Sequence, residues 1–445
     1  MKRKGIFTTE NTESTEVDSM ASMRSVMNTE DLPDGFQMIE LGPLPGEWRV
    51  VRLGELVEKH LLLIRGGFPQ GLHNEAGNGV PHLRPFNITN DGSLDLSQIK
   101  YIAPPSEDDP HWLLPNDVIF NNTNSEELVG KTALFDRNGR FVLSNHMTLL
   151  RILEPNQVDA YWLSRQLHYF WYLGLYKSLC RRHVNQASIS LERLKGIPIP
   201  LPPLDEQRAI SHVLRTVQRA KEATEQVIAA LKEFKKSLMR YLFTYGPVPI
   251  EQADKVELKN TEIGPVPAHW EVVRLGEITR MKQGNVLPTS SFTQHGYPVY
   301  GANGQIGWFK NYTHAENEVL VTCRGATCGT VNVSAPKSFI TNNAMVVTPI
   351  DETRLIKDYL ALALQVVDLR SCITGSGQPQ ITKGKLVLIH IPLPPLAEQK
   401  KIAEILISLD NKIKAEENKK SALETLFKTL LHNLMTGKIR VSNVE

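Results

Sequence analysis

Two short motifs each occur twice in this chain, and that repeat limits the possible folds more than any other feature. Residues 41–55 return as residues 263–277 with 10 of 15 positions identical, including the pattern Pro-x-x-Trp-x-Val-Val-Arg-Leu-Gly-Glu. Residues 199–207, Ile-Pro-Leu-Pro-Pro-Leu-Asp-Glu-Gln, return as residues 391–399 with a single change. Two motifs repeated in the same order predict a tandem duplication, with both halves built on one plan.

The segments between these motifs have diverged in length. The first motif recurs after 222 residues (264 − 42) and the second after 192 (391 − 199), so the intervening segment is 30 residues longer in the first half. The segments cover about residues 56–198 and 278–390. A frame that is kept twice around two different inserts indicates a scaffold carrying two modules of unlike specificity.

A helical pattern follows each copy of the second motif. In the first half it repeats every seven residues and stops at Gly246-Pro247, as expected for a seam between packed helices. The expected seam residues are Ile210, Val217, Thr224, Leu231 and Leu238, with Val213, Ala220, Val227, Phe234 and Tyr241 three positions further on. The second helix is expected from Glu398 to Thr436, with a polar stretch at residues 414–421. Either helix alone would fit an ordinary core helix, but two in related halves predict an antiparallel pair.

Length and charge narrow the class of protein. The 445 residues suffice for two or more globular domains, and the net charge of +2 means that any nucleic-acid contact must be local or shared with a partner. No stretch approaches the roughly 20 apolar residues that span a bilayer, so we expect no membrane association and a cytoplasmic location. The four cysteines fit a reducing compartment. Cys323 and Cys328 could suggest a zinc pair, but no second pair with ligand spacing follows.

The inserts show a mixed α/β character. Short strands are expected at residues 116–120, 141–143, 148–152, 318–321 and 345–347, and helices at residues 160–177 and 357–370. The first residues, rich in Thr, Glu and Ser, are expected to form a mobile tail. The predicted domains are a tail at 1–38, a first module at 39–198, a helical spacer at 199–246, a linker and second module at 247–390, and a second spacer with a C-terminal tail at 391–445.

The loops of both modules are rich in side chains that can read DNA bases. Arginine pairs with guanine edges and asparagine or glutamine with adenine edges in the major groove, while lysine contacts phosphates. Any one of these residues could equally be an ordinary surface or turn residue. The candidates of the first module are Arg84, Asn122, Asn124, Arg181, Arg182, Asn185 and Gln186. Those of the second are Lys282, Asn285, Arg324, Thr327, Asn342, Asn343, Ser376, Gln378 and Gln380.

Motifs for catalysis are missing from the sequence. There is no Asn/Asp-Pro-Pro-Tyr/Phe tetrapeptide for methyl transfer to a base amino group, and no Gly-x-Gly-x-x-Gly follows a strand. Gly130-Lys131-Thr132 resembles the end of a phosphate-binding loop, but Ser125 stands where that loop needs glycine. Two alternatives remain open: a DNA methyltransferase with a fused recognition domain, and a coiled-coil scaffold protein.

With these motifs together, the chain resembles the specificity subunit of type I restriction-modification enzymes. The resemblance covers about residues 41–440 and is carried by the two duplicated motifs and the helices that follow. Smaller elements also recur, and they pair Gly130-Lys131 with Gly329-Thr330, Asn145-His146-Met147 with Asn343-Ala344-Met345, and Gln186-Ala187-Ser188-Ile189 with Gln378-Pro379-Gln380-Ile381. The resemblance implies an α+β fold, a pseudo-two-fold tandem repeat with two α/β target-recognition domains separated by an antiparallel coiled coil of two long helices.

The resemblance also implies a function and a set of partners. Each target-recognition domain would read one half of a split, asymmetric sequence in double-stranded DNA, and the chain itself would be non-catalytic and bind no cofactor. Two modification subunits would bring S-adenosylmethionine and methylate adenine N6. Up to two restriction subunits would bring ATP- and Mg²⁺-dependent translocation and cleavage, completing an antiphage defence system.

Overall fold

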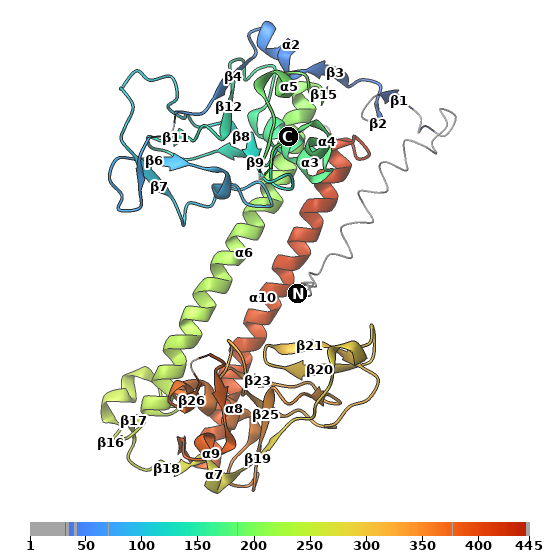
Figure 1. The fold of residues 1–445 in the computed structure, drawn as a ribbon. Helices are drawn as coiled ribbons and strands as arrows, with labels where there is room; N and C mark the ends of the chain where they lie inside the picture. Colours follow the sequence, from blue (N-terminus) through green and yellow to red (C-terminus); the bar gives the residue numbers. More distant parts are fainter. Residues whose placement is uncertain are drawn as a thin grey trace. The chain divides into compact units, whose positions relative to one another are not determined.

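The computed structural model describes residues 32, 35–39, 42–69, 71–184, 186–375 and 377–441. The chain divides into two compact units, Met1–Glu222 with Ser421–Glu445, and Ala223–Lys420. Each unit contains one α/β module and segments of both long helices, α6 (Leu204–Tyr245) and α10 (Leu396–Met435) (Figure 1). No helix among the described residues is both long and apolar enough to cross a membrane. The expected tail at 1–38 lies largely outside the described residues.

The first unit is built around an antiparallel sheet in the order β10-β8-β12-β4. Helix α3 (Ala160–Tyr172) packs on β8 and β10, and its buried aromatic residues join the largest core of the unit. A second sheet, in the order β11-β6-β7-β5, covers a smaller core. The strands are β4 (Leu62–Gly66), β5 (His73–Asn74), β6 (Val80–Leu83), β7 (Lys100–Ile102), β8 (Asp117–Asn121), β10 (Thr132–Phe135), β11 (Val142–Leu143) and β12 (Met147–Ile152).

The second unit repeats this plan in a shorter form. Its main sheet has the order β19-β25-β22-β23, its second sheet the order β21-β20-β24, and helix α8 (Lys357–Val366) packs on the main sheet. The strands are β19 (Thr279–Gln283), β20 (Tyr297–Gly301), β21 (Gly304–Phe309), β22 (Val319–Thr322), β23 (Val331–Val333), β24 (Phe339–Ile340) and β25 (Ala344–Pro349). All five expected strands are present, as β8, β11, β12, β22 and β25.

The two module helices are shorter than the sequence pattern predicts. The expected helix at 160–177 is split into α3 (Ala160–Tyr172) and α4 (Leu175–Leu179), because Gly174 adopts a left-handed conformation with φ of 71°. The expected helix at 357–370 ends at Val366 and is followed by a short 3₁₀ turn, Leu369–Cys372.

The duplicated motifs form the same structure in both units. Strand β3 (Arg49–Arg52) pairs with β15 (Pro198–Leu201), and β18 (Glu271–Arg274) pairs with β28 (His390–Leu393), both antiparallel. A β-hairpin precedes β3 and an equivalent one precedes β18. The first consists of β1 (Phe36–Ile39) and β2 (Gly42–Pro45), and the second of β16 (Leu258–Thr261) and β17 (Gly264–Pro267). A short helix follows β3 and β18, namely α2 (Leu53–Glu58) and α7 (Leu275–Ile278) respectively. The repeat therefore extends to the pairing of individual residues.

In each half the tryptophan of the first motif bonds to the glutamate of the second, and the glutamine of the second bonds within its own motif. The fully buried Trp48 donates from Nε1 to Glu206 Oε2 at 2.9 Å, and Trp270 donates to Glu398 Oε2 at 2.8 Å. Gln207 Nε2 donates to the Pro202 carbonyl at 2.9 Å, as the second copy's glutamine does to Pro394. The repeated residues thus fix where each long helix begins relative to its module.

The helix pair is antiparallel, as expected, but three residues of the predicted seam are exposed. In the first unit α6 and α10 share the core through Ile210, Leu214, Phe427 and Leu431. In the second unit Glu225 pairs with Lys420 and Lys235 with Asp410, so numbers rise along one helix as they fall along the other. The rows of α6 that are buried or partly buried along their whole length are Ile210, Val217, Thr224, Leu231 and Leu238 with Leu214, Lys221, Ile228, Lys235 and Leu242. Of the predicted second row, Ala220, Val227 and Phe234 are exposed, whereas Val213 and Tyr241 are partly buried against the two cores.

The polar middle of α10 is explained by ion pairs within the second unit. Glu417 accepts from Lys232 at 2.7 Å, and Lys420 lies 3.0 Å from Glu225. Glu416 pairs along its own helix with Lys412 and Lys419. The stretch at 414–421 is therefore part of the helix contact and not a break in it.

Candidate nucleic-acid interface

Four loop segments of the first module are joined by backbone hydrogen bonds, and we call them loop cluster 1: residues 67–69, 121–130, 144–147 and 181–189, of which Asn185 is not among the described residues. The Gly67 amide donates to the Met147 carbonyl at 2.9 Å, and the Asn122 amide to the His146 carbonyl at 3.0 Å. The Ile189 amide donates to the Asn122 carbonyl at 2.9 Å. These bonds gather side chains from distant parts of the sequence.

The second module repeats the arrangement in loop cluster 2: residues 284–286, 322–329, 341–344 and 373–381, of which Ser376 is not among the described residues. Here the Gly284 amide donates to the Ala344 carbonyl at 3.1 Å, and the Cys323 amide to the Asn343 carbonyl at 2.8 Å. The Ile381 amide donates to the Cys323 carbonyl at 3.0 Å. The same three bonds join the same loops in both modules.

Glycine is required where these loops approach most closely. A Cβ atom on Gly67 would lie 1.9 Å from the Ser144 carbonyl oxygen, and one on Gly284 would lie 2.4 Å from that of Thr341. Both separations are too short for a real side chain. The glycine at this position therefore fixes the contact between the loop that leaves the first strand of the main sheet, β4 or β19, and the loop before the last strand in chain order, β12 or β25.

The structure tests the three short pairs of segments that the sequence predicts to be equivalent in the two halves. Gly130 and Gly329 are equivalent, with φ of 95° and 92°, and their amides make the same backbone bond at 2.8 Å. The segments at 186–189 and 378–381 are equivalent through the Ile189 and Ile381 amides. The third expectation is wrong by one residue: the bridges Phe68 to Ser144 and Asn285 to Thr341 make Asn145 equivalent to Asn342.

The candidate side chains of the first module differ in whether they are exposed or hydrogen-bonded within the module. Arg181 and Gln186 are exposed on the hairpin of β13 (Arg181–Arg182) and β14 (Ala187–Ser188), and Arg182 donates to Glu126 at 2.6 Å. That hairpin extends to β9 (Thr123–Asn124). Asn122 Nδ2 donates to Thr148 Oγ1 at 2.9 Å, so its amide is used within the module.

Two further candidates of the first module have local backbone contacts. Asn124 Oδ1 accepts from the Ser125 amide at 2.8 Å. Arg84 is partly buried and follows Leu83, whose carbonyl accepts from the Ser144 amide at 2.8 Å, so it lies beside loop cluster 1.

In the second module five candidates present exposed side chains, namely Lys282, Asn285, Arg324, Gln378 and Gln380. Strands β26 (Ile373–Thr374) and β27 (Gln380–Ile381) form the hairpin, and Gln380 is bridged to Arg324. Thr327 is used within the fold, since its Oγ1 donates to the Ala302 carbonyl at 2.6 Å. Asn342 and Asn343 are partly buried, and their carbonyls accept from Gln283 and Cys323.

Two exposed residues in or next to these clusters were not among the candidates predicted from sequence. Asn145 is exposed in loop cluster 1 at the position of Asn342, and only the corrected alignment of the repeat could have identified it. Gln283 is exposed immediately before loop cluster 2, and its Nε2 donates to the Asn342 carbonyl at 2.6 Å.

Cys323, Cys328 and Lys131, which lie in or beside these clusters, are buried or partly buried. Burial raises the pKa of Cys323 and of Cys328, so both thiols stay protonated at neutral pH. Lys131, in the segment that resembles a phosphate loop, is buried and donates to the Ile88 carbonyl at 3.3 Å. Among the described residues, no group of three or more His, Cys, Asp or Glu side chains is placed to hold a metal.

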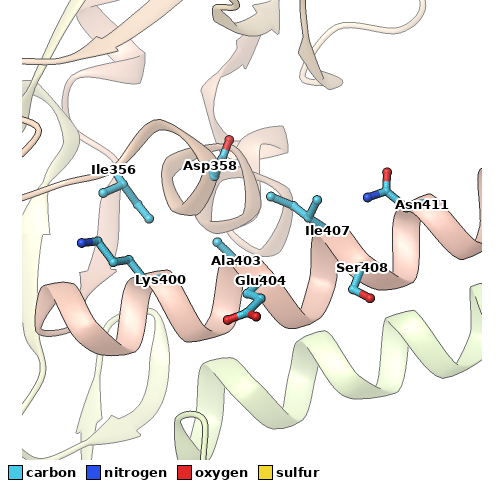
Figure 2. A pocket seen from close by; sticks show the side chains of 8 residues that line it. All are labelled: Ile356, Asp358, Lys400, Ala403, Glu404, Ile407, Ser408 and Asn411. Carbon is cyan, nitrogen blue, oxygen red and sulfur yellow. The ribbon is translucent and has the colours of Figure 1, made fainter.

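A groove of about 440 Å³ lies away from these loops, between the start of α8 and α10 (Figure 2). Its side chains include Asp358, Lys400, Glu404 and Ile407. In the first unit Tyr161 and Arg215 occupy the positions of Asp358 and Ile407, and the guanidinium stacks 4.3 Å above the ring. The groove therefore opens where the second unit lacks this pair.

Comparison with known proteins assigns the chain to a family. The family model described as the type I restriction modification DNA specificity domain matches residues 45–233 and 267–425. The putative type I restriction enzyme MjaX specificity subunit of Methanocaldococcus jannaschii is 30% identical over 426 residues, covering 92% of this chain and 97% of the relative. The MjaVIII specificity subunit of the same organism is 26% identical and covers 90% and 95%.

A solved structure shows the same fold. The S subunit of a type I restriction-modification system from M. genitalium matches with a TM-score of 0.61 at 17% identity, covering 87% of this chain and 96% of that one. With both duplicated segments matched by the family model and nearly the full length shared with a curated relative, this chain belongs to the family of type I restriction-modification specificity subunits.

Proposed function

We propose that loop cluster 1 and loop cluster 2 each read one half of a bipartite, asymmetric DNA target. The observation that carries this proposal is the pair of equivalent backbone frames with unlike side chains. Asn122 and Cys323 occupy the same position, and the bonds that recur in both modules at this position use their main-chain groups. A frame of this kind can present different residues to DNA without changing its own hydrogen bonds.

The exposed side chains suit base readout. Arg324 and Arg181 can each donate two hydrogen bonds to a guanine edge, and Gln378, Gln380 and Gln186 can pair with adenine. Each such contact is worth roughly 1–3 kcal/mol of discrimination. Because the two clusters carry different sets, the two half-sites should differ in sequence, which makes the target asymmetric.

The chemistry belongs to partner subunits in this proposal. The chain recognises the DNA target. Two modification subunits bring S-adenosylmethionine and methylate adenine N6, and up to two restriction subunits bring ATP and Mg²⁺ for translocation and cleavage. Two related halves favour two modification subunits, since each half can offer an equivalent surface. One candidate surface is the apolar row of α6 outside the helix seam, where Val227 is 42% and Phe234 56% exposed.

The test is a methylome of a host that expresses this chain with its modification subunit. Arg324→Ala or Gln378→Ala should relax one half-site and leave the other unchanged, while Arg181→Ala should relax only the opposite half-site. Arg219→Ala, an exposed arginine on α6, is the matched control. If one variant altered both half-sites, or if all three left both intact, the assignment of one cluster to each half would be wrong.

A separate assay addresses catalysis. The purified chain incubated with S-adenosylmethionine and target DNA should transfer no methyl group, and transfer should begin when the modification subunit is added. Labelled methyl on DNA treated with the chain alone would favour the fused methyltransferase instead.

A further inference from the structure

The most exposed large apolar side chains of the described chain are found mainly on its loops. Val184 is 99% exposed, Leu72 98%, Ile250 77% and Val286 76%. Val184 belongs to loop cluster 1 and Val286 to loop cluster 2, while Leu72 follows the segment that begins at Gly67. Ile250 lies elsewhere, in the 3₁₀ turn Ile250–Lys255. Each loop cluster therefore contains one strongly exposed valine.

Val184 is carried by a well-connected and basic hairpin. The hairpin is closed by the His183 amide, which donates to the Gln186 carbonyl at 2.7 Å, and strand β14 pairs with β9. Arg181, Arg182 and His183 precede the valine and are all exposed. A side chain in this setting would meet a polyanion before any other partner.

Val286 is carried by an equally constrained segment. The preceding residue, Asn285, donates its amide to the Ile340 carbonyl and accepts from the Asn342 amide, both at 2.9 Å. Lys282, four residues earlier, is exposed and supplies the positive charge. Because valine is branched at Cβ, few rotamers are lost when such a side chain makes a contact.

Duplex DNA offers one apolar group at the base edges of its major groove, the C5-methyl of thymine. We propose that Val184 and Val286 are specificity-determining residues, each of which contacts a thymine methyl in the half-site read by its own loop cluster. This inference rests on the proposed function of the clusters. It adds thymine to the guanine and adenine that arginine and glutamine can recognise. The two valines assign an A·T pair to each half-site.

The experiment uses the complex of this chain with its modification subunits and a duplex containing the target found by methylome sequencing. Deoxyuridine replaces each thymine of the target in turn, which removes only the methyl group. For the wild-type complex, one replacement in each half-site should raise Kd about fourfold, the value for burial of one methyl group. Val184→Ala should abolish the effect in one half-site only, and Val286→Ala in the other only. Ile250→Ala, at a similarly exposed apolar residue, should change neither.

The outcomes distinguish failure of the valine contacts from failure of the function proposed for the two loop clusters. If no deoxyuridine replacement weakens binding, or if the effect persists in both valine variants, the thymine contacts are wrong. Should Arg324→Ala and Arg181→Ala still relax one half-site each in that case, the clusters remain the readers and only the role of the valines fails. If those arginine variants also leave the target unchanged, the reading clusters themselves are misassigned.

Discussion

The position of Phe234 on α6 gives a sharp test of how the long helices pack. The sequence pattern places this side chain in the helix seam, whereas the structure leaves it 56% exposed and buries Ile228, which is only 9% exposed. Replacing a buried phenylalanine by alanine costs about 3–5 kcal/mol, because a cavity remains. With more than half of the ring already in water, Phe234→Ala should cost only about 1 kcal/mol.

Ile228→Ala is the matched control on the same helix. A buried isoleucine truncated to alanine loses about 2–5 kcal/mol, so this variant should be clearly less stable than Phe234→Ala. Urea unfolding of the isolated chain, followed by far-ultraviolet circular dichroism, measures both free energies of unfolding. The slope of the unfolding free energy against urea should stay the same in both variants, since neither changes the surface exposed on unfolding.

The two variants should also differ in assembly. Phe234→Ala should weaken association with the modification subunit, because it removes apolar surface that faces outward, while Ile228→Ala should leave that surface unchanged. A free-energy loss for Phe234→Ala equal to or larger than that for Ile228→Ala would refute the helix register described above.

Three further predictions concern the frame and the helices. Glu206→Ala should destabilise the chain by about 3 kcal/mol and Glu398→Ala by less, because the nearly buried Glu206 pairs with Arg440 at 2.6 Å, whereas the more exposed Glu398 pairs with His269 at 2.8 Å; urea unfolding of both variants checks the order. Burial lowers the pKa of His168 to about 3, so this residue alone should lower stability by about 1.4 kcal/mol per pH unit as the pH drops from about 6.5 towards 3; His168→Gln should reduce the measured slope by that amount. Paired insertions of seven residues in α6 and α10 should change the gap between the half-sites and leave their sequences intact, which a methylome would show.

The frame of the fold is predictable from sequence because its residues act through their side chains. Trp48 and Glu206 bond to each other, and so do Trp270 and Glu398, so a change in either member would leave a buried group without its partner. Such pairs stay recognisable in both copies of a duplication. The start of each long helix follows from the same motifs.

The helix register was harder to predict because the correct seam contains two lysines. Lys221 and Lys235 lie in the buried rows, whereas the competing row offers only apolar residues and tyrosine. Lys221 is tolerated because it pairs with Asp91, and Lys235 because it pairs with Asp410. These acids are distant in sequence, so apolar periodicity alone favours the wrong row.

Residue type alone did not predict which candidate side chains are exposed. Asn122 and Asn145 look alike in sequence, yet one amide is bonded to Thr148 and the other is exposed. Hydrogen bonds between loops decide this difference, and they depend on contacts made across the fold. The exposed valines gave no signal in sequence, because an apolar residue between polar ones also fits a short strand.

The division of labour between backbone and side chains explains how one frame can serve two specificities. The bonds that join the loops use the main-chain groups of Asn122 and Cys323, of His146 and Asn343, and of Ile189 and Ile381. Main-chain bonds survive most substitutions, provided that the close approach at Gly67 and at Gly284 is kept. The exposed side chains of the two loop clusters can then change with little effect on stability. Divergence of the two modules in loop length and residue type is the expected result when only the readers, and not the frame, change with the DNA target.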